Sequence, residues 1–249
     1  MRLFILAAGT GSRLMPLTKN TPKSLLDLGD GTTLLERQLN NAIESGIIDD
    51  IIILTGYKKE QIEAKIVEYK GRIKIRTIYN PFYENSNNLF SLYFAYTFML
   101  QKDFLITNGD NIYQQGIYQR INEGSPEEGI TITIDYRDEY DDDDMKVTFL
   151  EDKLVKKVHK EIPLDKTDAE SVGLAIVKGK RSRKLFKKKV IQMIKDEANI
   201  NKYWLVVFNE LVKEGIPINT VEIDQSEWRE MDFHPDLKNL RELVFKDVI

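Results

Sequence analysis

Cysteine is absent from the sequence, which excludes disulfide bonds and metal sites built on thiolates. Long apolar runs are absent as well, and no stretch approaches the roughly 18 residues that a membrane-spanning helix needs. The N-terminus lacks the basic and then apolar layout of a signal peptide. Positive charge is not in excess either, because the net charge is −4, so nothing indicates a nucleic-acid partner. We therefore expect a cytoplasmic protein with no membrane partner.

The composition is otherwise that of a folded protein. Hydrophobic residues make up 42% of the chain and charged residues 31%. A length of 249 residues is ample for a buried core, and we expect one domain over residues 1–249. An enzyme of anionic substrates with this net charge would have to gather its cations at one place.

A loop of small residues follows the first apolar run. Residues 2–6 are typical of a buried parallel strand, and the loop after them carries almost no side chains. Gly9 and Gly11 can adopt positive φ angles, so backbone N–H groups could surround a phosphate, with Arg13 and Lys23 beside it. A purely steric role for the two glycines is an equally good explanation of the loop by itself.

The pattern around this loop resembles a known signature. Residues 6–26 match L-A-A-G-x-G-x-R-L-x-P-L-T-x-x-x-P-K-x-L-L at every fixed position. This signature is that of nucleotidyltransferases that join a nucleoside triphosphate to a phosphorylated sugar or alcohol. The resemblance implies that Arg13 and Lys23 neutralise phosphate charge. It also implies that the loop holds the nucleotide phosphates through Leu6, Ala7, Ala8, Gly9, Thr10 and Gly11.

Strand and helix patterns alternate in the first third of the chain. Apolar runs at 51–57 and 73–79 predict buried strands, and helical spacing with a capping pair, Thr33 and Glu36, predicts a helix that ends at Gly46. A second amphipathic helix is expected over 58–69. This order predicts an α/β fold, a doubly wound and mostly parallel mixed sheet of the nucleotidyltransferase type, with its site at the carboxyl ends of the strands.

Residues 80–100 carry a second resemblance. Apolar spacing predicts a helix that begins at Asn87 or Asn88 and includes residues as far as Phe98. The Q-x-x-P-x-G-L-x-x-A motif of sugar-nucleotide pyrophosphorylases is missing. The segment instead resembles the N-x-x-Y-x-x-x-N-N-x-x-S-L pattern of bacterial cytidylyltransferases acting on phosphocholine and 2-aminoethylphosphonate. This implies that Asn87, Asn88 and Ser91 lie close to the base, since amide side chains can hydrogen-bond its Watson–Crick edge.

Two further segments contain carboxylates that are candidates for binding a metal ion. Residues 104–113 predict a strand that ends in the polar sequence NGDN, which is also compatible with a hairpin turn. The resemblance implies that Asp110 coordinates Mg²⁺, an ion that oxygen ligands suit. Residues 228–237 resemble the W-x-E-I-D-x-x-x-D-L ending of the phosphocholine-type enzymes, which implies that Glu230 and Asp232 join Asp110 at the metal. Trp228 is expected to serve packing.

An antiparallel insertion is expected at about 130–160. Strand patterns at 130–136 and 146–150 lie on either side of the acidic sequence RDEYDDDD. We interpret this sequence as a solvated loop. The alternative is that one or two of the residues Asp141–Asp144 bind a cationic head group of the substrate. Lys160 and Gly173 resemble the E-K-P…G-L-Y arrangement of glucose-1-phosphate thymidylyltransferases, without its proline. The resemblance implies that Lys160 holds the substrate phosphate. His159 is expected at the surface.

Three other segments complete the prediction. The basic run 178–189 favours a helix with a solvated lysine face over nucleic-acid binding. Another helix is expected over 203–213, and a final strand over 218–223.

Together these features predict Mg²⁺-dependent transfer of CMP from CTP to a small phosphorylated alcohol or phosphonate, with Arg13, Lys23 and Lys160 as catalytic cations. We expect the acceptor to carry a positive charge. The candidates that would bind it are Tyr136 and Tyr140 beside the acidic loop and the aromatic rings near the asparagine pair, Tyr83 and Phe90, and we expect the acidic loop to contribute at most a minor, salt-sensitive share. Two alternatives are a sugar-1-phosphate nucleotidyltransferase that uses UTP or dTTP and a catalytically silent nucleotide-binding module. A homodimer is compatible with the sequence, which is silent on oligomeric state.

Overall fold

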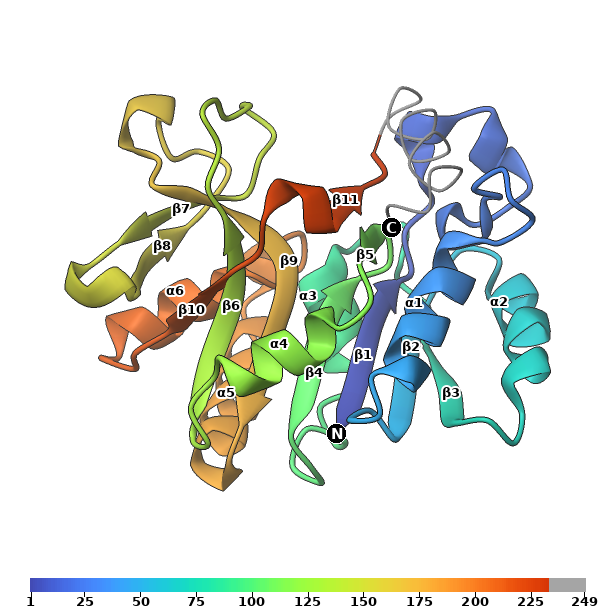
Figure 1. The fold of residues 1–249 in the computed structure, drawn as a ribbon, viewed down its shortest axis with the longest axis horizontal. Coiled ribbons are helices and arrows are strands. Elements are labelled where there is room, and N and C mark those ends of the chain that lie inside the picture. The colour runs from blue at the N-terminus through green and yellow to red at the C-terminus, as the bar shows by residue number, and fades with distance from the viewer. Residues whose placement is uncertain (233–249) are drawn as a thin grey trace.

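A mixed sheet forms the centre of the molecule in the computed structural model, which describes residues 1–232 (Figure 1). Its main path has the order β10-β6-β9-β4-β1-β2-β3, and the hairpin β7–β8 extends it beside β9. Strand β9 is antiparallel to both β4 and β6, whereas the remaining neighbours on the path pair in parallel. The predicted fold class, a mostly parallel mixed sheet, is confirmed.

The strands of the large sheet are β1 Arg2–Ala7, β2 Asp50–Thr55, β3 Lys74–Tyr79, β4 Phe104–Asn108, β6 Gly129–Asp135, β7 Lys146–Phe149, β8 Val155–Val158, β9 Ala169–Lys178 and β10 Asn219–Glu222. A second, two-stranded sheet pairs β5 Asn111–Tyr113 with β11 Trp228–Glu230. The α-helices are α1 Leu34–Glu44, α2 Lys59–Ile66, α3 Asn88–Tyr93, α4 Ile117–Glu123, α5 Lys180–Ile194 and α6 Val206–Lys213.

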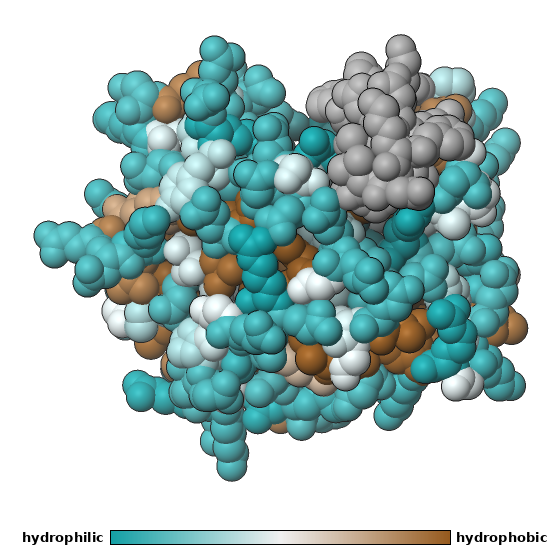
Figure 2. Space-filling model, viewed as in Figure 1, coloured by the Kyte–Doolittle hydropathy of each residue, from teal (hydrophilic) through white to brown (hydrophobic). Residues whose placement is uncertain are grey.

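Helices cover both faces of the large sheet. Side chains alternate along β1, so Leu3 and Ile5 pack with α1, α2 and α4, while Phe4 packs on the opposite face with α3, α5 and α6. The outer sides of the helices are polar, and the face of the molecule in Figure 2 is mostly hydrophilic. Within residues 1–232, the helices fall short of the length and apolarity needed to cross a bilayer. The large sheet is thus buried between two helical layers, and its carboxyl edge is left open for a site.

The capping residues predicted from the sequence mark the starts of two helices correctly. Helix α1 begins with a full capping box, in which the side chain of Thr33 accepts from the backbone of Glu36 and the side chain of Glu36 accepts from the backbone of Thr33. Asn87 caps α3 as expected.

Other predicted elements were wrong. Helix α3 ends at Tyr93, and residues 94–100 form turns. The strand expected over 104–113 is split by a turn into β4 and β5. Strand β6 belongs to the main sheet, so the antiparallel excursion begins after Asp135. Helix α4 and the ten-residue strand β9 were not predicted.

The basic segment is only partly a solvated face. Lys178 is buried at the end of β9, where its Nζ lies 3.0 Å from Glu127, and Lys189 is buried on α5 at 2.6 Å from Glu214. The prediction of an ordinary solvated lysine face is therefore wrong at these two positions, because each aliphatic stem packs inward while the ammonium group is paired.

Candidate functional site

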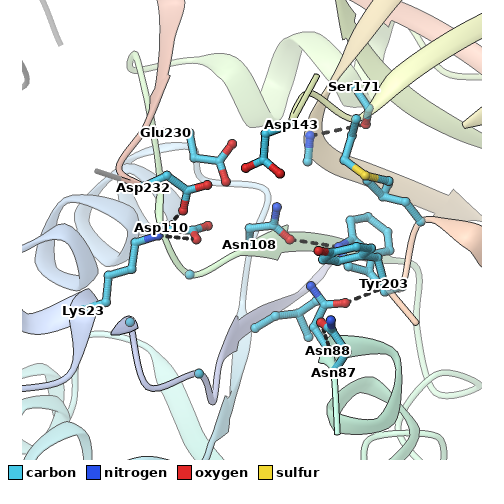
Figure 3. Close-up of a pocket in the computed structure, with 18 of the residues that line it drawn as sticks. Lys23, Asn87, Asn88, Asn108, Asp110, Asp143, Ser171, Tyr203, Glu230 and Asp232 are labelled. Carbon is cyan, nitrogen blue, oxygen red and sulfur yellow. Dashed lines mark hydrogen bonds and ion pairs between the residues drawn. The ribbon is translucent and has the colours of Figure 1, made fainter. Parts of the chain in front are cut away.

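A cleft of about 660 Å³ opens at the carboxyl ends of β1 and β4 (Figure 3). Its walls come from the loop after β1, the start of α3, the start of β9, the acidic loop, the segment before α6, and β11. Figure 3 shows the carboxylates of Asp110, Glu230 and Asp232 on one side and Asn87 and Asn88 on another. The predicted site residues therefore share one cavity, with the exception of Thr10, which is not among its lining residues.

The glycines of the first loop have different roles. Gly11 has a φ angle of 65°, and a Cβ there would come within 3.0 Å of both Lys23 and Thr18. The carbonyl of Gly11 accepts from Leu14 N at 3.0 Å and from Thr18 Oγ1 at 2.8 Å, which fixes the turn. Gly9 does not have a positive φ angle, contrary to expectation, and a Cβ there would meet no atom within 4 Å. Gly11 is therefore needed for conformation, whereas Gly9 leaves open space at the cleft.

A glycine that the sequence analysis missed positions Asp110. Gly109 donates its N–H to the carbonyl of Leu6 at 2.9 Å, and a Cβ at Gly109 would lie 2.7 Å from that oxygen. On the other side, Met231 N donates to the carbonyl of Asp110 at 3.0 Å, and β5 pairs with β11 so that Asn111 lies opposite Glu230. These backbone contacts bring the turn after β4 and the segment after β11 together.

Three carboxylates meet as a result. Asp110, Glu230 and Asp232 each offer an oxygen within 4.8 Å of the others. Burial raises the pKa of Glu230 well above its usual range, and Asp110 and Asp232 add to the effect by repulsion. Oδ1 of Asp110 is buried and accepts no hydrogen bond within the described residues. A hard divalent cation would satisfy this oxygen and offset the repulsion, so the residues fit Mg²⁺.

Lys23 lies between two of these carboxylates. Its Nζ is 2.7 Å from Oδ2 of Asp110 and 2.6 Å from Oδ1 of Asp232. Burial alone would lower the pKa of Lys23, but the attraction of the two carboxylates outweighs burial and raises it. Arg13 is 2.9 Å from Oδ2 of Asp232. Both cations predicted to neutralise phosphate thus border the carboxylate cluster.

The asparagine pair and Ser91 line the cleft, and their oxygens are held by the protein. Oδ1 of Asn87 accepts from the backbone of Asn88 at 2.7 Å, and Oδ1 of Asn88 accepts from Trp204 N at 2.8 Å. Oγ of Ser91 accepts from Asn80 at 2.9 Å. The Nδ2 groups of Asn87 and Asn88 donate no hydrogen bond within residues 1–232, so amide donors remain on this wall.

Several lining residues were not predicted. Trp204 is buried before α6 and donates its Nε1–H to Oδ1 of Asn108 at 2.9 Å. Gly173 has a φ angle of 74°, and a Cβ there would lie 2.6 Å from Nδ2 of Asn108. The space that a side chain at position 173 would need is therefore occupied by Asn108. The position of Asn108 directly before the GDN tip was a signal that could have identified it.

The acidic loop is not simply solvated. Asp143 is 2.7 Å from Arg13 and 2.5 Å from Lys160, although half of its own side chain is exposed. Burial would raise the pKa of Asp143, but its hydrogen bond to Lys160 and the nearby Arg13 lower it. Lys160 also lies over the ring of Tyr203 at 5.2 Å. The predicted catalytic cations Arg13 and Lys160 are therefore bridged by a carboxylate in this structure.

A second charged cluster lies on the wall formed by β9, β11 and the acidic loop. Glu170 is buried, and burial raises its pKa to about 8, with Arg137 opposing the shift and Asp144 adding to it. Arg137 lies 2.9 Å from Oε2 of Glu170 and 3.2 Å from Asp135. Trp228 is buried in the hydrophobic core beside β1, which bears out a packing role, and it also lines the cleft and donates its Nε1–H to Asp135 at 3.0 Å.

The remaining predictions concern rings and a histidine. Among the rings considered for a cationic acceptor, Tyr83 lines the cleft, whereas Phe90, Tyr136 and Tyr140 do not. His159 is partly exposed beyond β8, as expected. Residues 236 and 237 of the predicted C-terminal motif lie outside the described residues.

Comparison with known proteins gives the family. The "Nucleotidyl transferase" family model matches residues 3–144. The chain is 43% identical to choline-phosphate cytidylyltransferase of Streptococcus pneumoniae over 37% of this chain and 38% of that one, and 37% identical to the Haemophilus influenzae enzyme of the same name over 47% of each. The matches thus span less than half the length of these curated relatives. The solved structure of CTP:phosphocholine cytidylyltransferase from S. pneumoniae aligns over 98% of both chains, with a TM-score of 0.78 and 25% identity. This chain belongs to the nucleotidyl transferase family.

Proposed function

We propose that this protein is a Mg²⁺-dependent cytidylyltransferase that transfers CMP from CTP to a small phosphorylated alcohol or phosphonate. The observation that carries the proposal is the convergence, in one cleft, of the loop after β1, the cations Arg13, Lys23 and Lys160, and the carboxylate cluster. The named relatives support the choice of CTP and of a phosphocholine-like acceptor.

In the proposed reaction, an acceptor phosphate oxygen bonds to the α-phosphorus of CTP while the bond to the leaving pyrophosphate breaks. The attacking oxygen is already anionic, so the protein needs no nucleophilic side chain. Asp110, Glu230 and Asp232 would hold Mg²⁺, which when bound would neutralise phosphate charge.

The cations have separate tasks in this proposal. Arg13 and Lys23 border the first loop and would stabilise the charge of the triphosphate and of the departing pyrophosphate. Lys160, which Asp143 links to Arg13, would bind the acceptor phosphate and place its oxygen in line. Asn87 and Asn88 have unused amide donors, which suit the acceptor atoms O2 and N3 of cytosine.

A screen of pyrophosphate release tests the function. Each of CTP, UTP, ATP and GTP is combined with phosphocholine, 2-aminoethylphosphonate, inositol phosphate and glucose 1-phosphate in the presence of Mg²⁺. We expect CTP to exceed every other nucleotide by at least about tenfold in kcat/KM with one of the first two acceptors, which corresponds to about 1.4 kcal/mol. Preference for UTP with the sugar phosphate would favour the sugar-nucleotide alternative, and absence of turnover in every combination would favour a silent binding module.

A further inference from the structure

The wall of the cleft formed by β9, β11 and the acidic loop has an unusual set of charges. We name it the acceptor wall, and its residues are Arg137, Asp141, Asp144, Glu170, Trp228 and Arg229. Buried Asp135 supports it from behind through Arg137 and Trp228. The wall with its support thus has four carboxyl groups and two guanidinium groups, so its formal charge is negative when all are ionised.

The rings of Trp228 and Tyr203 on this side of the cleft each have a cation of the protein over one face. The guanidinium of Arg137 lies over the ring of Trp228 at 5.3 Å, and Nζ of Lys160 lies over Tyr203 at 5.2 Å. Trp204 is completely buried. A quaternary ammonium group donates no hydrogen bonds and relies on open aromatic faces for recognition. The described residues of the acceptor wall do not offer it one.

The guanidinium groups on the wall are also engaged. Arg137 is paired with Asp135 and Glu170, and Arg229 donates to the carbonyls of Gln225 and Trp228. An anionic head group would have to compete with these contacts and with the surrounding carboxylates. The wall is therefore poorly suited to a carboxylate on the acceptor.

Glu170 has a buried oxygen that lacks a hydrogen-bond donor. The residue is 4% exposed and lines the cleft, and its Oε2 accepts no hydrogen bond within residues 1–232, although Arg137 lies 2.9 Å away as an ion-pair partner. Burial makes the ionised form of this carboxyl group costly while Oε2 has no hydrogen-bond donor, and a ligand that is both positively charged and able to donate would relieve that cost. A primary ammonium group has both properties.

We propose that Glu170 recognises a primary ammonium group on the acceptor, so that the preferred substrate is a 2-aminoalkyl phosphate or phosphonate in place of its trimethylated counterpart. This inference rests on the proposed nucleotidyl transfer. Glu170 acts here as a specificity residue, because the reacting phosphorus and oxygen atoms are assigned to the cations and carboxylates elsewhere in the cleft.

Three matched acceptors test the inference. With CTP and Mg²⁺, kcat/KM is measured for 2-aminoethyl phosphate, phosphocholine and 2-hydroxyethyl phosphate. We expect the amine to exceed the other two by at least about tenfold. A value for phosphocholine or for the neutral alcohol equal to that for the amine overturns the inference while leaving the proposed function intact. Absence of turnover with all three acceptors counts against the proposed function alone. In that case, calorimetric binding of the same three compounds to the CTP-loaded protein decides the head-group preference.

Variants of Glu170 show whether this residue is responsible. In Glu170→Gln, the ratio of kcat/KM for the amine to that for the neutral alcohol should fall at least about tenfold, and Glu170→Asp should restore part of the ratio. The control is Asp142→Asn, which removes a carboxylate from the same loop at an exposed position outside the lining of the cleft and should leave the ratio unchanged. A merely structural role for Glu170 would lower both acceptors together, and an unchanged ratio in Glu170→Gln would contradict the assignment.

Discussion

The two sides of the cleft are constructed differently. The side assigned to the nucleotide is centred on one continuous segment, residues 6–26, with the turn at Gly109 and Asp110 packed directly against β1. The asparagine pair at the start of α3 and the carboxylates Glu230 and Asp232 complete it. The acceptor wall is assembled from β9, β11 and the acidic loop, which are far apart in the sequence. The family match covers residues 3–144 and ends inside the acidic loop. The match does not divide the two sides, since it includes the loop residues of the acceptor wall and excludes Glu230 and Asp232 of the carboxylate cluster. The two sides differ instead in that the nucleotide side depends mainly on local contacts and the acceptor wall on distant ones.

The largest expected effect is on the chemistry of the nucleotide side. Replacing Asp110 with Asn removes one charge from the carboxylate cluster that would hold Mg²⁺. On the proposed function, turnover should fall by about a thousandfold or more, while the thermal midpoint and most of the CTP affinity are retained. Pyrophosphate release, calorimetry and thermal unfolding measure the three quantities. Asp142→Asn is the matched control, and turnover of Asp110→Asn within a few-fold of wild type would refute the metal assignment.

A smaller effect is expected from the glycine that supports Asp110. In Gly109→Ala the new Cβ would lie 2.7 Å from the carbonyl of Leu6, so the turn must shift and carry Asp110 with it. We expect a loss of about 3 kcal/mol in the free energy of unfolding and a lower kcat. Gly9→Ala is the contrasting variant, because its Cβ meets no protein atom within 4 Å. It should keep its stability and lose CTP affinity, and the opposite pattern in urea denaturation and CTP titration would show that Gly9 serves only the fold.

The same contrast explains what could be predicted from the sequence. The capping box of Thr33 and Glu36 and the loop at residues 7–12 are local features, so their residue types indicate them directly. Strand β9 was missed although residues 172–177 form an apolar run, because polar residues that are buried in the fold, Glu170, Ser171 and Lys178, stand near its ends and hide its full length. A residue's role on the acceptor wall depends on sheet neighbours that only the complete topology supplies. Asp143 was interpreted as solvated for the same reason, since its partners Arg13 and Lys160 lie on other segments.

Glu170 of the acceptor wall should change how the free energy of unfolding depends on pH. Burial raises the pKa of Glu170 to about 8 in the folded state, from an ordinary 4.5. The folded state therefore binds this proton more tightly than the unfolded state does. The resulting contribution to the free energy of unfolding is complete below about pH 4.5 and is lost as the pH rises toward 8. Gln cannot ionise, so the stability advantage of Glu170→Gln over wild type should grow by about 2.5 kcal/mol between pH 6 and pH 9.

Urea denaturation at these two pH values measures the advantage. Arg137, Asp135, Asp141 and Asp144 surround the group and are present in both proteins, so their own titration cancels to first order in the comparison. Parallel pH dependence of the wild type and Glu170→Gln would show that the carboxyl group is not held in its neutral form. A variant that is more stable but less selective for the amine would show that the wall sacrifices stability for recognition.

The smallest expected effect is at the junction of the two sides. Asp143 pairs with Arg13 and Lys160, the cations assigned to the nucleotide and to the acceptor phosphate, so its carboxylate lies where phosphate oxygens would compete for the same donors. Ion pairs this exposed contribute about 0–1 kcal/mol, so Asp143→Asn should leave the thermal midpoint nearly unchanged. Removing the competitor should lower KM for CTP or the acceptor by about two- to fivefold and weaken the salt dependence of KM, because ligand phosphate no longer displaces a carboxylate. Steady-state kinetics at two salt concentrations, with Asp142→Asn as the control, measure both quantities. If Asp143 instead holds Arg13 and Lys160 in position for the reaction, KM rises and kcat falls in Asp143→Asn. That result would show that Asp143 positions the two cations and does not compete with the ligand phosphates for them.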